Sequence, residues 1–318
     1  MTREIPNAGL QPLRESTDVK LWDQELPPSA EELDTLLKGC DGAITLLTDR
    51  IDGSVLDRHP RLRVVSNFAV GYDNIDVPAA TERGVLVCNT PDVLTNATAD
   101  HTWTLLLSAA RRVPESIDYV REGKWKTWGP LLLLGQEVSG ATIGIVGLGR
   151  IGKEVAKRAR GFDMRVLAFD PFENEAFARD HGVTYVPLER LLEESDFVTL
   201  HVALTPETWH LIGATELGRM KPTAILVNAS RGPVVDTDAL VSALQTGSIR
   251  GAALDVTDPE PLAADHPLVT MPNCIVVPHT ASATVQTRDR MADLAARNLL
   301  AGLKGERPPA AVNADEVL

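Results

Sequence analysis

The sequence predicts an α/β fold made of two domains, each with a doubly wound parallel sheet. Between residues 141 and 280, short apolar runs alternate with amphipathic helical segments, and a shorter N-terminal stretch shows the same order. The apolar runs lack polar–apolar alternation, which is typical of strands buried on both faces of a parallel sheet. A chain of 318 residues is long enough for two cores.

The apolar runs also place the individual elements. The expected strands of the larger block are residues 142–146, 165–169, 184–186, 197–200, 224–228, 251–256 and 274–277. The N-terminal block is expected to contain strands at 43–47, 63–67 and 86–88, and helices at 30–37 and 79–82. The segment 97–110 is apolar almost all round, which indicates a buried helix.

A glycine motif follows the first strand of the larger block and opens a helical pattern at 153–160. Gly147 allows a tight turn, Gly149 leaves room for a pyrophosphate, and Gly152 lets helix and strand pack closely. The helix N-terminus offers unpaired N–H groups to phosphates. Asp170 ends the next strand, where a carboxylate can accept both adenosine-ribose hydroxyls and would repel a 2′-phosphate. The motif therefore predicts a dinucleotide site that prefers NAD to NADP; a turn without a ligand would not explain the acid.

The larger block is thus the expected NAD-binding domain, of Rossmann-like type, over residues 96–283. A last helix at 285–303 follows its final strand and can return the chain to the first domain. The first domain, Rossmann-like or flavodoxin-like, would then be discontinuous, with residues 1–95 plus 284–318, and is expected to bind the substrate.

Charge and cysteine content exclude several functional classes. Acidic residues outnumber basic ones and the formal net charge is −13, so the chain is a poor candidate for binding nucleic acid or an anionic membrane. Cys40, Cys88 and Cys274 lie far apart without a Cys-x-x-Cys motif, which favours free thiols over a disulfide or zinc site, and no other metal site is expected. The polar N-terminus and short apolar runs predict neither a signal peptide nor a membrane span, hence a cytoplasmic protein.

An apolar segment at 123–135 reads as a loop, yet it contains two tryptophans and four leucines. Loops of this composition usually cover other apolar surface. Packing on the chain's own core is one explanation. We favour a subunit interface, because aromatic residues are enriched at interfaces.

Chemically useful side chains follow three strands of the larger block. Arg231 follows strand 224–228, Asp255 lies at the end of the next strand with Glu260 after it, and His279 follows the last one. In an open parallel sheet these positions share the edge that carries the glycine turn. Arg231 can hold a carboxylate and polarise a carbonyl, and His279 can exchange the proton that hydride transfer requires. Glu260 would stabilise the imidazolium and fix its ring.

Each of these residues has an ordinary structural explanation when taken alone. Arg231 could form a cap or salt bridge, Glu260 could be a solvated turn acid, and Asp255 could cap a helix or turn. Most of the seven histidines are expected to be structural. The joint placement on one edge favours a catalytic set.

These residues give the chain its resemblance to a known family. It resembles the D-isomer-specific 2-hydroxyacid dehydrogenases, and within them the glyoxylate/hydroxypyruvate reductase branch. The resemblance covers nearly the whole chain and rests on the motifs SNFAVGYDNID (66–76), GLGRIG (147–152), NASRGP (228–233), ALDV (253–256), DPEP (258–261) and PHTASAT (278–284).

The resemblance implies roles that composition would not reveal. Arg231, Glu260 and His279 would form the catalytic set. The backbone at Val70 and Gly71 would bind the substrate carboxylate, and Arg231 and His279 would also contact the substrate. Besides the three glycines, the implied cofactor-lining residues are Thr98, Arg150, Ile151, Asp170, His201, Thr205, Ala229, Arg231, Asp255 and His279, with Asp255 meeting the nicotinamide carboxamide. A homodimer is implied, in which Trp128 reaches towards the partner's active site.

The chain departs from the family pattern in two places. Many members of this branch have an uncharged or basic residue where Asp170 stands and prefer NADP, so the acid favours NAD here. Members also usually begin with a strand before the position of Glu4, which only three residues precede here. Either the start is mis-assigned or the first domain has one strand fewer and an exposed edge.

The expected activity is NAD(H)-dependent interconversion of a small 2-oxo acid, glyoxylate or hydroxypyruvate, and its D-2-hydroxy acid. A phosphoglycerate or phosphite dehydrogenase is an alternative within the family; formate enzymes of this kind carry Gln where Glu260 stands. A non-catalytic NAD(H)-sensing protein, like the transcriptional corepressors that resemble this family, is the alternative from another class. The Arg–Glu–His set disfavours it.

Overall fold

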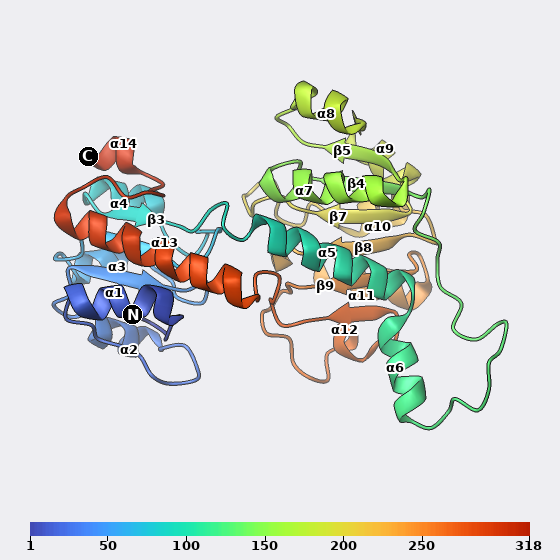
Figure 1. Ribbon diagram of the computed structural model, residues 1–318, viewed down its shortest axis with the longest axis horizontal. Helices are drawn as coiled ribbons and strands as arrows, with labels where there is room; N and C mark the ends of the chain where they lie inside the picture. The colour runs from blue at the N-terminus through green and yellow to red at the C-terminus, as the bar shows by residue number, and fades with distance from the viewer. The chain divides into compact units, whose positions relative to one another are not determined.

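The computed structural model describes all 318 residues, which form two compact units (Figure 1). Unit 1 contains Met1–Leu94 and Ser282–Leu318, so both ends of the chain contribute to it. Unit 2 is the continuous segment Thr95–Ala281. Each unit has its own parallel sheet covered by helices.

Unit 2 contains a seven-stranded parallel sheet with the strand order β10-β9-β8-β7-β4-β5-β6. All seven expected strands are present within two residues of their expected bounds. They are β4 (Thr142–Val146), β5 (Arg165–Phe169), β6 (Val183–Tyr185), β7 (Phe197–Leu200), β8 (Ile225–Asn228), β9 (Gly251–Leu254) and β10 (Cys274–Val276). The order reverses between β4 and β7, where doubly wound sheets bind their ligands beyond the carboxyl ends of the strands.

Helices cover both faces of this sheet, which explains the unbroken apolar strands. Ile143 and Ile145 pack in one core cluster, on the face covered by α5 (Thr95–Ala110), α7 (Arg150–Ala159) and α8 (Glu175–His181). Val146 and Leu200 pack in a second cluster with α9 (Leu188–Glu194), α10 (Ala214–Arg219) and α11 (Thr237–Thr246). Shorter elements are α6 (Val113–Arg121), η1 (Arg160–Phe162), η2 (Gly232–Val234) and α12 (Pro267–Thr270).

Unit 1 contains three parallel strands in the order β1 (Gly42–Thr45), β2 (Val64–Asn67) and β3 (Leu86–Cys88). Residues of α2 (Ala30–Leu37), α3 (Gly53–Arg58) and α4 (Val77–Glu82) pack with Val65 and Val87 on one face. On the other face lie α13 (Val285–Lys304) and α1 (Asn7–Ser16), and α14 (Ala314–Val317) follows. Thr2 N donates to Ile44 O (3.2 Å) beside β1.

The return of the chain through α13 is fixed by close contacts in unit 1. Ser66 Oγ in β2 donates to Ala295 O at 3.0 Å. A Cβ atom added at Gly302 would lie 2.8 Å from Val64 Cβ, so the helix sits directly on the sheet. The expected helix at 285–303 is therefore confirmed.

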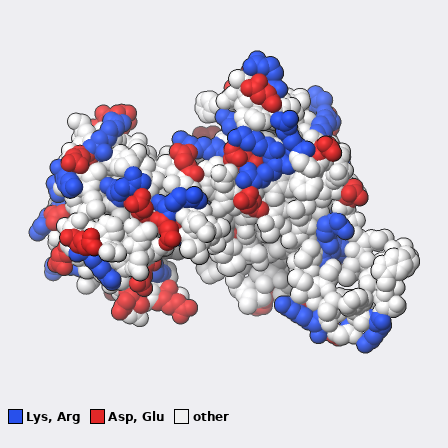
Figure 2. All heavy atoms as spheres, in the orientation of Figure 1, with Lys and Arg blue, Asp and Glu red and all other residues white.

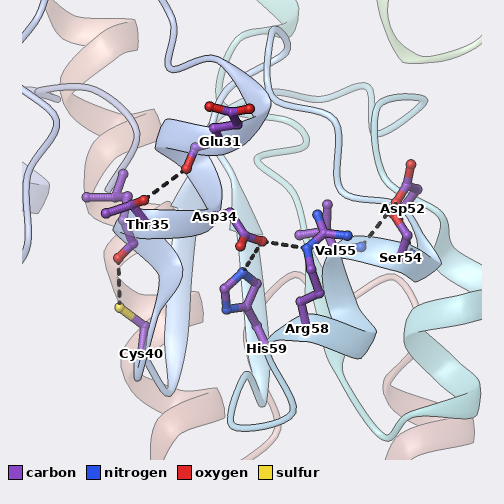
Figure 3. Close-up of polar contacts among 10 residues, drawn as sticks. Glu31, Asp34, Thr35, Cys40, Asp52, Ser54, Val55, Arg58 and His59 are labelled. Carbon is purple, nitrogen blue, oxygen red and sulfur yellow. Dashed lines mark hydrogen bonds and ion pairs between the residues drawn. The ribbon is translucent and has the colours of Figure 1, made fainter.

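Polar contacts join α2 to α3 on the surface of unit 1 (Figure 3). Ser29 and Glu32 form a capping box that starts α2. Further along, Asp34 accepts hydrogen bonds from Arg58 Nε (2.6 Å) and His59 Nε2 (2.9 Å). The bond from Arg58, followed by that from His59, holds the pKa of Asp34 below its usual value.

The sequence analysis placed no helix at α1, α3, α6 or the short α14. Pro12 lies inside α1 and interrupts its pattern, α3 has only six residues, and α6 buries none of its residues. The three cysteines are free, and burial raises the pKa of Cys88 and Cys274 to about 12. No helix combines the length and the apolar character needed to cross a bilayer.

Candidate active site

The glycine turn after β4 has the geometry of a phosphate cradle. Gly147 has φ +93°, in the region that favours glycine, and a Cβ there would lie 2.8 Å from the backbone at His201. A Cβ at Gly152 would lie 2.1 Å from Gly147 O, so no side chain fits between helix and turn. At Gly149 a Cβ would meet no protein atom within 4 Å, which leaves open space beside the turn.

Helix α7 begins at this turn without a capping side chain. The helix starts at Arg150, three residues earlier than the sequence pattern indicated, so Arg150 and Ile151 lie in its first turn. Its N-cap, Gly149, has no side chain to cap the first N–H groups. Unpaired N–H groups and the positive end of the helix dipole suit an anionic phosphate.

Asp170 follows β5 and is tied to the glycine turn. Its Oδ2 accepts the N–H of Leu148 at 2.7 Å, and its Oδ1 accepts the N–H of Phe172 at 2.8 Å. The side chain is half-buried. The carboxylate is therefore held beside the turn, as a group that accepts ribose hydroxyls would be. Together with the cradle, this arrangement fits a dinucleotide.

The loops after β8 and β9 pack against one another. A Cβ at Gly232 would lie 1.9 Å from Thr257 O, which shows how closely the two loops approach. Asn228 Nδ2 donates to Arg231 O (2.8 Å), and Arg231 Nη1 donates to Ser230 O (2.9 Å). Arg231 is thus held at the carboxyl end of β8, next to the loop that contains Glu260.

His279 and Glu260 form a direct pair. His279 Nδ1 lies 2.7 Å from Glu260 Oε1. Glu260 Oε2 accepts the N–H of Thr257 at 3.3 Å, which orients the carboxylate. The side chain of His279 is 28% exposed and that of Glu260 42% exposed, so the pair stays accessible. With Nδ1 engaged, Nε2 of the ring is the nitrogen left to exchange a proton with a substrate.

The backbone of His279 adopts a left-handed conformation, with φ +52°. This region is uncommon for residues other than glycine. Two hydrogen bonds hold it: the N–H of His279 lies 2.9 Å from Asp255 O and 3.0 Å from Val277 O. Uncommon backbone conformations of this kind cluster at functional sites.

Asp255 is 1% exposed, and its carboxylate accepts hydrogen bonds from the protein backbone. Its Oδ1 accepts the N–H of Thr280 (2.7 Å) and its Oδ2 that of Ala281 (2.9 Å), the two residues after His279. Burial alone would raise the pKa of Asp255. His101 and the two N–H groups outweigh this effect, and the pKa is lowered. A direct contact of Asp255 with the nicotinamide carboxamide stays a prediction.

His101 in α5 is a site residue that the sequence did not reveal. Its Nε2 lies 3.2 Å from Asp255 Oδ1, close enough for an ion pair but not aligned as a hydrogen bond. The only signal in the sequence is its position three residues after Thr98, on the same helical face. Thr98 itself is buried in the first turns of α5.

The remaining expected cofactor contacts lie in the loops at the same sheet edge. His201 follows β7; burial lowers its pKa to about 3, and its Nδ1 has no hydrogen-bond partner. The ring is therefore neutral at physiological pH, with Nε2 2.9 Å from Thr199 Oγ1. Thr205 is exposed after β7, and Ala229 is buried after β8.

The expected contacts of the substrate carboxylate, Val70 and Gly71, lie in unit 1, half-buried in the loop after β2.

Comparison with known proteins gives the same picture. Residues 103–281 match the family model of the D-isomer specific 2-hydroxyacid dehydrogenase, NAD binding domain. A glyoxylate reductase of Korarchaeum cryptofilum is 54% identical over 318 residues, covering 100% of this chain and 96% of the relative.

Two solved structures extend the likeness to the fold. A protein of Thermus thermophilus has a TM-score of 0.92 and 47% identity, covering 98% of each chain. An NADPH-dependent glyoxylate/hydroxypyruvate reductase of Sinorhizobium meliloti has a TM-score of 0.83 and 33% identity, covering 98% of this chain and 96% of that one. The protein is thus an oxidoreductase that uses a nicotinamide dinucleotide and a small oxo acid. The chain belongs to the D-isomer specific 2-hydroxyacid dehydrogenase family.

Proposed function

We propose that this protein is an NAD(H)-dependent reductase that converts glyoxylate or hydroxypyruvate to the corresponding D-2-hydroxy acid. The observation that carries the proposal is the 2.7 Å contact between His279 Nδ1 and Glu260 Oε1, at the sheet edge that carries the glycine turn. The name of the Korarchaeum relative, a glyoxylate reductase, supports this substrate class.

His279 acts as the general acid in this proposal. When bound, the reduced nicotinamide supplies a hydride to the carbonyl carbon, and the carbonyl oxygen takes up a proton. His279 donates that proton from Nε2 and regains one from solvent, while Glu260 stabilises the imidazolium through Nδ1. Arg231 polarises the carbonyl and binds the carboxylate through its planar fork of donors. In the oxidative direction His279 acts as the base.

The substrate carboxylate also requires donors, and we assign these to the backbone N–H groups of Val70 and Gly71. The roles of the units follow: residues 96–283 hold the cofactor, and residues 1–95 plus 284–318 hold the substrate. In addition to the glycine turn and Asp170, we assign to the cofactor site Thr98, Arg150, Ile151, His201, Thr205, Ala229 and Asp255.

NAD is the proposed cofactor rather than NADP because of Asp170. A carboxylate tied to the glycine turn through Leu148 N–H would repel the 2′-phosphate of NADP. The Sinorhizobium reductase is named as NADPH-dependent, so the proposal of NAD for this chain rests on Asp170 and not on family membership. We place such an NAD(H)-dependent reductase in the cytoplasm.

A homodimer is proposed from the apolar surface around α6. The arm, defined here as residues 123–135, has no helix or strand and exposes Trp128 (79%) and Leu131 (80%). Its visible surface is largely uncharged (Figure 2). Val113, Ile117 and Val120 form an exposed apolar stripe on α6 just before it. A second copy of the chain is the proposed cover, with Trp128 directed to the partner's active site.

The activity is tested with the purified protein and a panel of 2-oxo acids. We expect oxidation of NADH with glyoxylate or hydroxypyruvate to be faster than with pyruvate or 3-phosphohydroxypyruvate. His279→Ala should lower kcat by about 10²- to 10⁴-fold, because general acid catalysis is lost, while the Kd of NADH stays unchanged. The absence of turnover with every 2-oxo acid, with NADH and with NADPH, would refute the proposed reaction.

His210→Ala is a matched control for the His279 variant. His210 also has a left-handed backbone (φ +50°) and lies beside an acid, with Nδ1 3.7 Å from Asp236 Oδ2. It belongs to no part of the proposed site, so its variant should keep the native kcat. Equal losses in the two variants would assign the effect to backbone disturbance rather than to acid catalysis by His279.

A further inference from the structure

Three successive carbonyl groups in the loop after β2 are held by hydrogen bonds within unit 1. Ala69 O accepts the N–H of Thr90, Val70 O accepts Nδ2 of Asn89, and Gly71 O accepts Nδ2 of Asn67, each at 2.8 Å. These peptide bonds are trans. In a trans peptide, the N–H of the next residue points opposite to the carbonyl.

The direction of three N–H groups follows from these contacts. The N–H groups of Val70, Gly71 and Tyr72 face away from the partners that hold the carbonyls. None of the three donates a hydrogen bond within unit 1. Val70 and Gly71 are half-buried and Tyr72 is 41% exposed. The loop therefore presents a row of three unpaired donors, an arrangement that recurs in anion-binding sites.

The side chain of Asn67 is fixed by hydrogen bonds at both its oxygen and its nitrogen. It is fully buried, its Oδ1 accepts Thr45 Oγ1 (3.0 Å), and its Nδ2 also lies 3.1 Å from Asn74 Oδ1. Asn74 in turn donates to Leu46 O (3.0 Å) and Asp49 O (2.8 Å). Because a carbonyl can only accept, Gly71 O requires the Nδ2 of Asn67 to face it. Turning the amide over would leave buried groups unsatisfied.

Asn89 is fixed through its backbone. Its N–H donates to Ala310 O (3.1 Å), and its O accepts Nδ2 of Asn298 (2.9 Å). The fixed backbone of Asn89 thereby places its side-chain Nδ2 against Val70 O. Neither asparagine has a charge, and neither needs to touch the ligand to set the direction of the N–H groups.

We propose that Asn67 and Asn89 are positioning residues that hold the N–H groups of Val70, Gly71 and Tyr72 ready for the substrate carboxylate. This inference rests on the proposed function, and it adds Tyr72 N–H as a third donor and names the residues that orient the set. The loop is ordered when the protein folds, so substrate binding does not have to supply the free energy of ordering it.

The test uses Asn89→Ala, which removes the donor to Val70 O. The KM of the preferred 2-oxo acid should rise about 10-fold, the effect of one lost hydrogen bond, with kcat and the Kd of NADH nearly unchanged. The Ki of oxalate, a competitive carboxylate inhibitor, should rise in parallel. The KM of methylglyoxal, a 2-oxo aldehyde without a carboxylate, should not change. Asn89→Asp keeps the shape, removes the donor and adds a repelling charge, so its KM effect should be larger.

Asn313→Ala is the matched control in the same unit. Asn313 accepts the N–H of Val87 (2.8 Å) and donates to Val85 O (3.0 Å), away from the loop after β2. Its loss should lower the Tm without changing the KM ratio of the 2-oxo acid to methylglyoxal. An Asn89→Ala protein with an unchanged ratio would overturn the positioning role.

Failure of the proposed function gives a different result. A native protein that reduces no 2-oxo acid would refute the reaction, yet oxalate binding by calorimetry would still report on the donors. Tighter oxalate binding by the native chain than by Asn89→Ala or Asn89→Asp supports the positioning role of Asn89, and equal binding contradicts it. Asn89→Asp, being isosteric, serves if the alanine variant does not fold.

Discussion

Asp170 and Asp255 each follow a parallel strand, but their surroundings give them different tasks. Asp170 is half-buried and accepts N–H groups from the glycine turn and from Phe172. Asp255 is 1% exposed and accepts the N–H groups of Thr280 and Ala281. In the sequence, the position of each acid directly after a strand does not distinguish the two. Burial distinguishes the half-buried Asp170 from Asp255, whose two oxygens also hold the backbone of the residues after His279.

Asp170→Asn should therefore change cofactor preference. Removing the charge while keeping the size lowers the repulsion of a 2′-phosphate, so kcat/KM for NADPH relative to NADH should rise by about 10-fold or more, about 1.4 kcal/mol. Initial rates with both cofactors at a fixed 2-oxo acid concentration measure the ratio. Glu173→Gln, an exposed acid nearby, should leave it unchanged. A native protein that already prefers NADPH would contradict the argument.

The sequence could predict some of these residues and not others. Glu260 and His279 follow neighbouring strands β9 and β10, so their proximity follows from strand order. The approach of His101 to Asp255 depends on how α5 packs on the sheet, which only tertiary structure determines. The hold of Asn67 and Asn89 on the loop after β2 likewise joins residues that no local pattern connects.

At the scale of elements, the turn between β4 and α7 assigns a separate task to each glycine. A Cβ at Gly152 collides with Gly147 O at 2.1 Å, whereas a Cβ at Gly149 meets no protein atom within 4 Å. Gly152 is required by the fold, and Gly149 by the space that a ligand needs. Stability and binding can therefore be separated by substitution.

Gly149→Ala should keep the native Tm and weaken NADH binding by about 10-fold or more, about 1.4 kcal/mol, because the methyl group enters ligand space. Gly152→Ala should lower both the Tm and the affinity, because α7 must shift. Gly161→Ala is the control, since its Cβ also meets no atom and its φ is not positive; it should change neither. Thermal melts and NADH fluorescence titrations give the two quantities. Full NADH affinity in Gly149→Ala would count against the cradle.

Elements with strong burial were predictable, and elements without it were not. The strands of unit 2 lie between two helical layers, so apolar composition identifies each one. Helix α6 buries nothing in this chain, so no core-facing pattern marks it. Strand ends shifted by one or two residues, as at β9, because hydrogen bonding rather than composition sets where a strand stops.

At the scale of the whole molecule, the arm and α6 bring several exposed apolar side chains together along one stretch of the chain. Trp125, Trp128, Leu131 and Leu134 are all more than half exposed. The two tryptophans are the residue type most enriched among interface hot spots. The composition of the segment identified it as a surface, but the sequence alone did not show that the chain's own core leaves it uncovered.

We expect the native protein to have twice the chain mass of 34.4 kDa in solution. Leu131→Asp places a charge at the centre of the arm and should shift the population towards monomer, because burying an unpaired charge is costly. Light scattering coupled to size exclusion measures the mass. Leu26→Asp, at a similarly exposed leucine (75%) outside the arm, should keep the native mass. A native monomer would refute the dimer.

The assembly of unit 1 from both chain ends has a consequence for biosynthesis. Strand β2 is covered by α13, which packs Gly302 against Val64. A ribosome finishes all of Thr95–Ala281 before it makes that helix. Unit 2 can therefore fold on the ribosome first, while the first 94 residues keep one face of their sheet uncovered until α13 has been made.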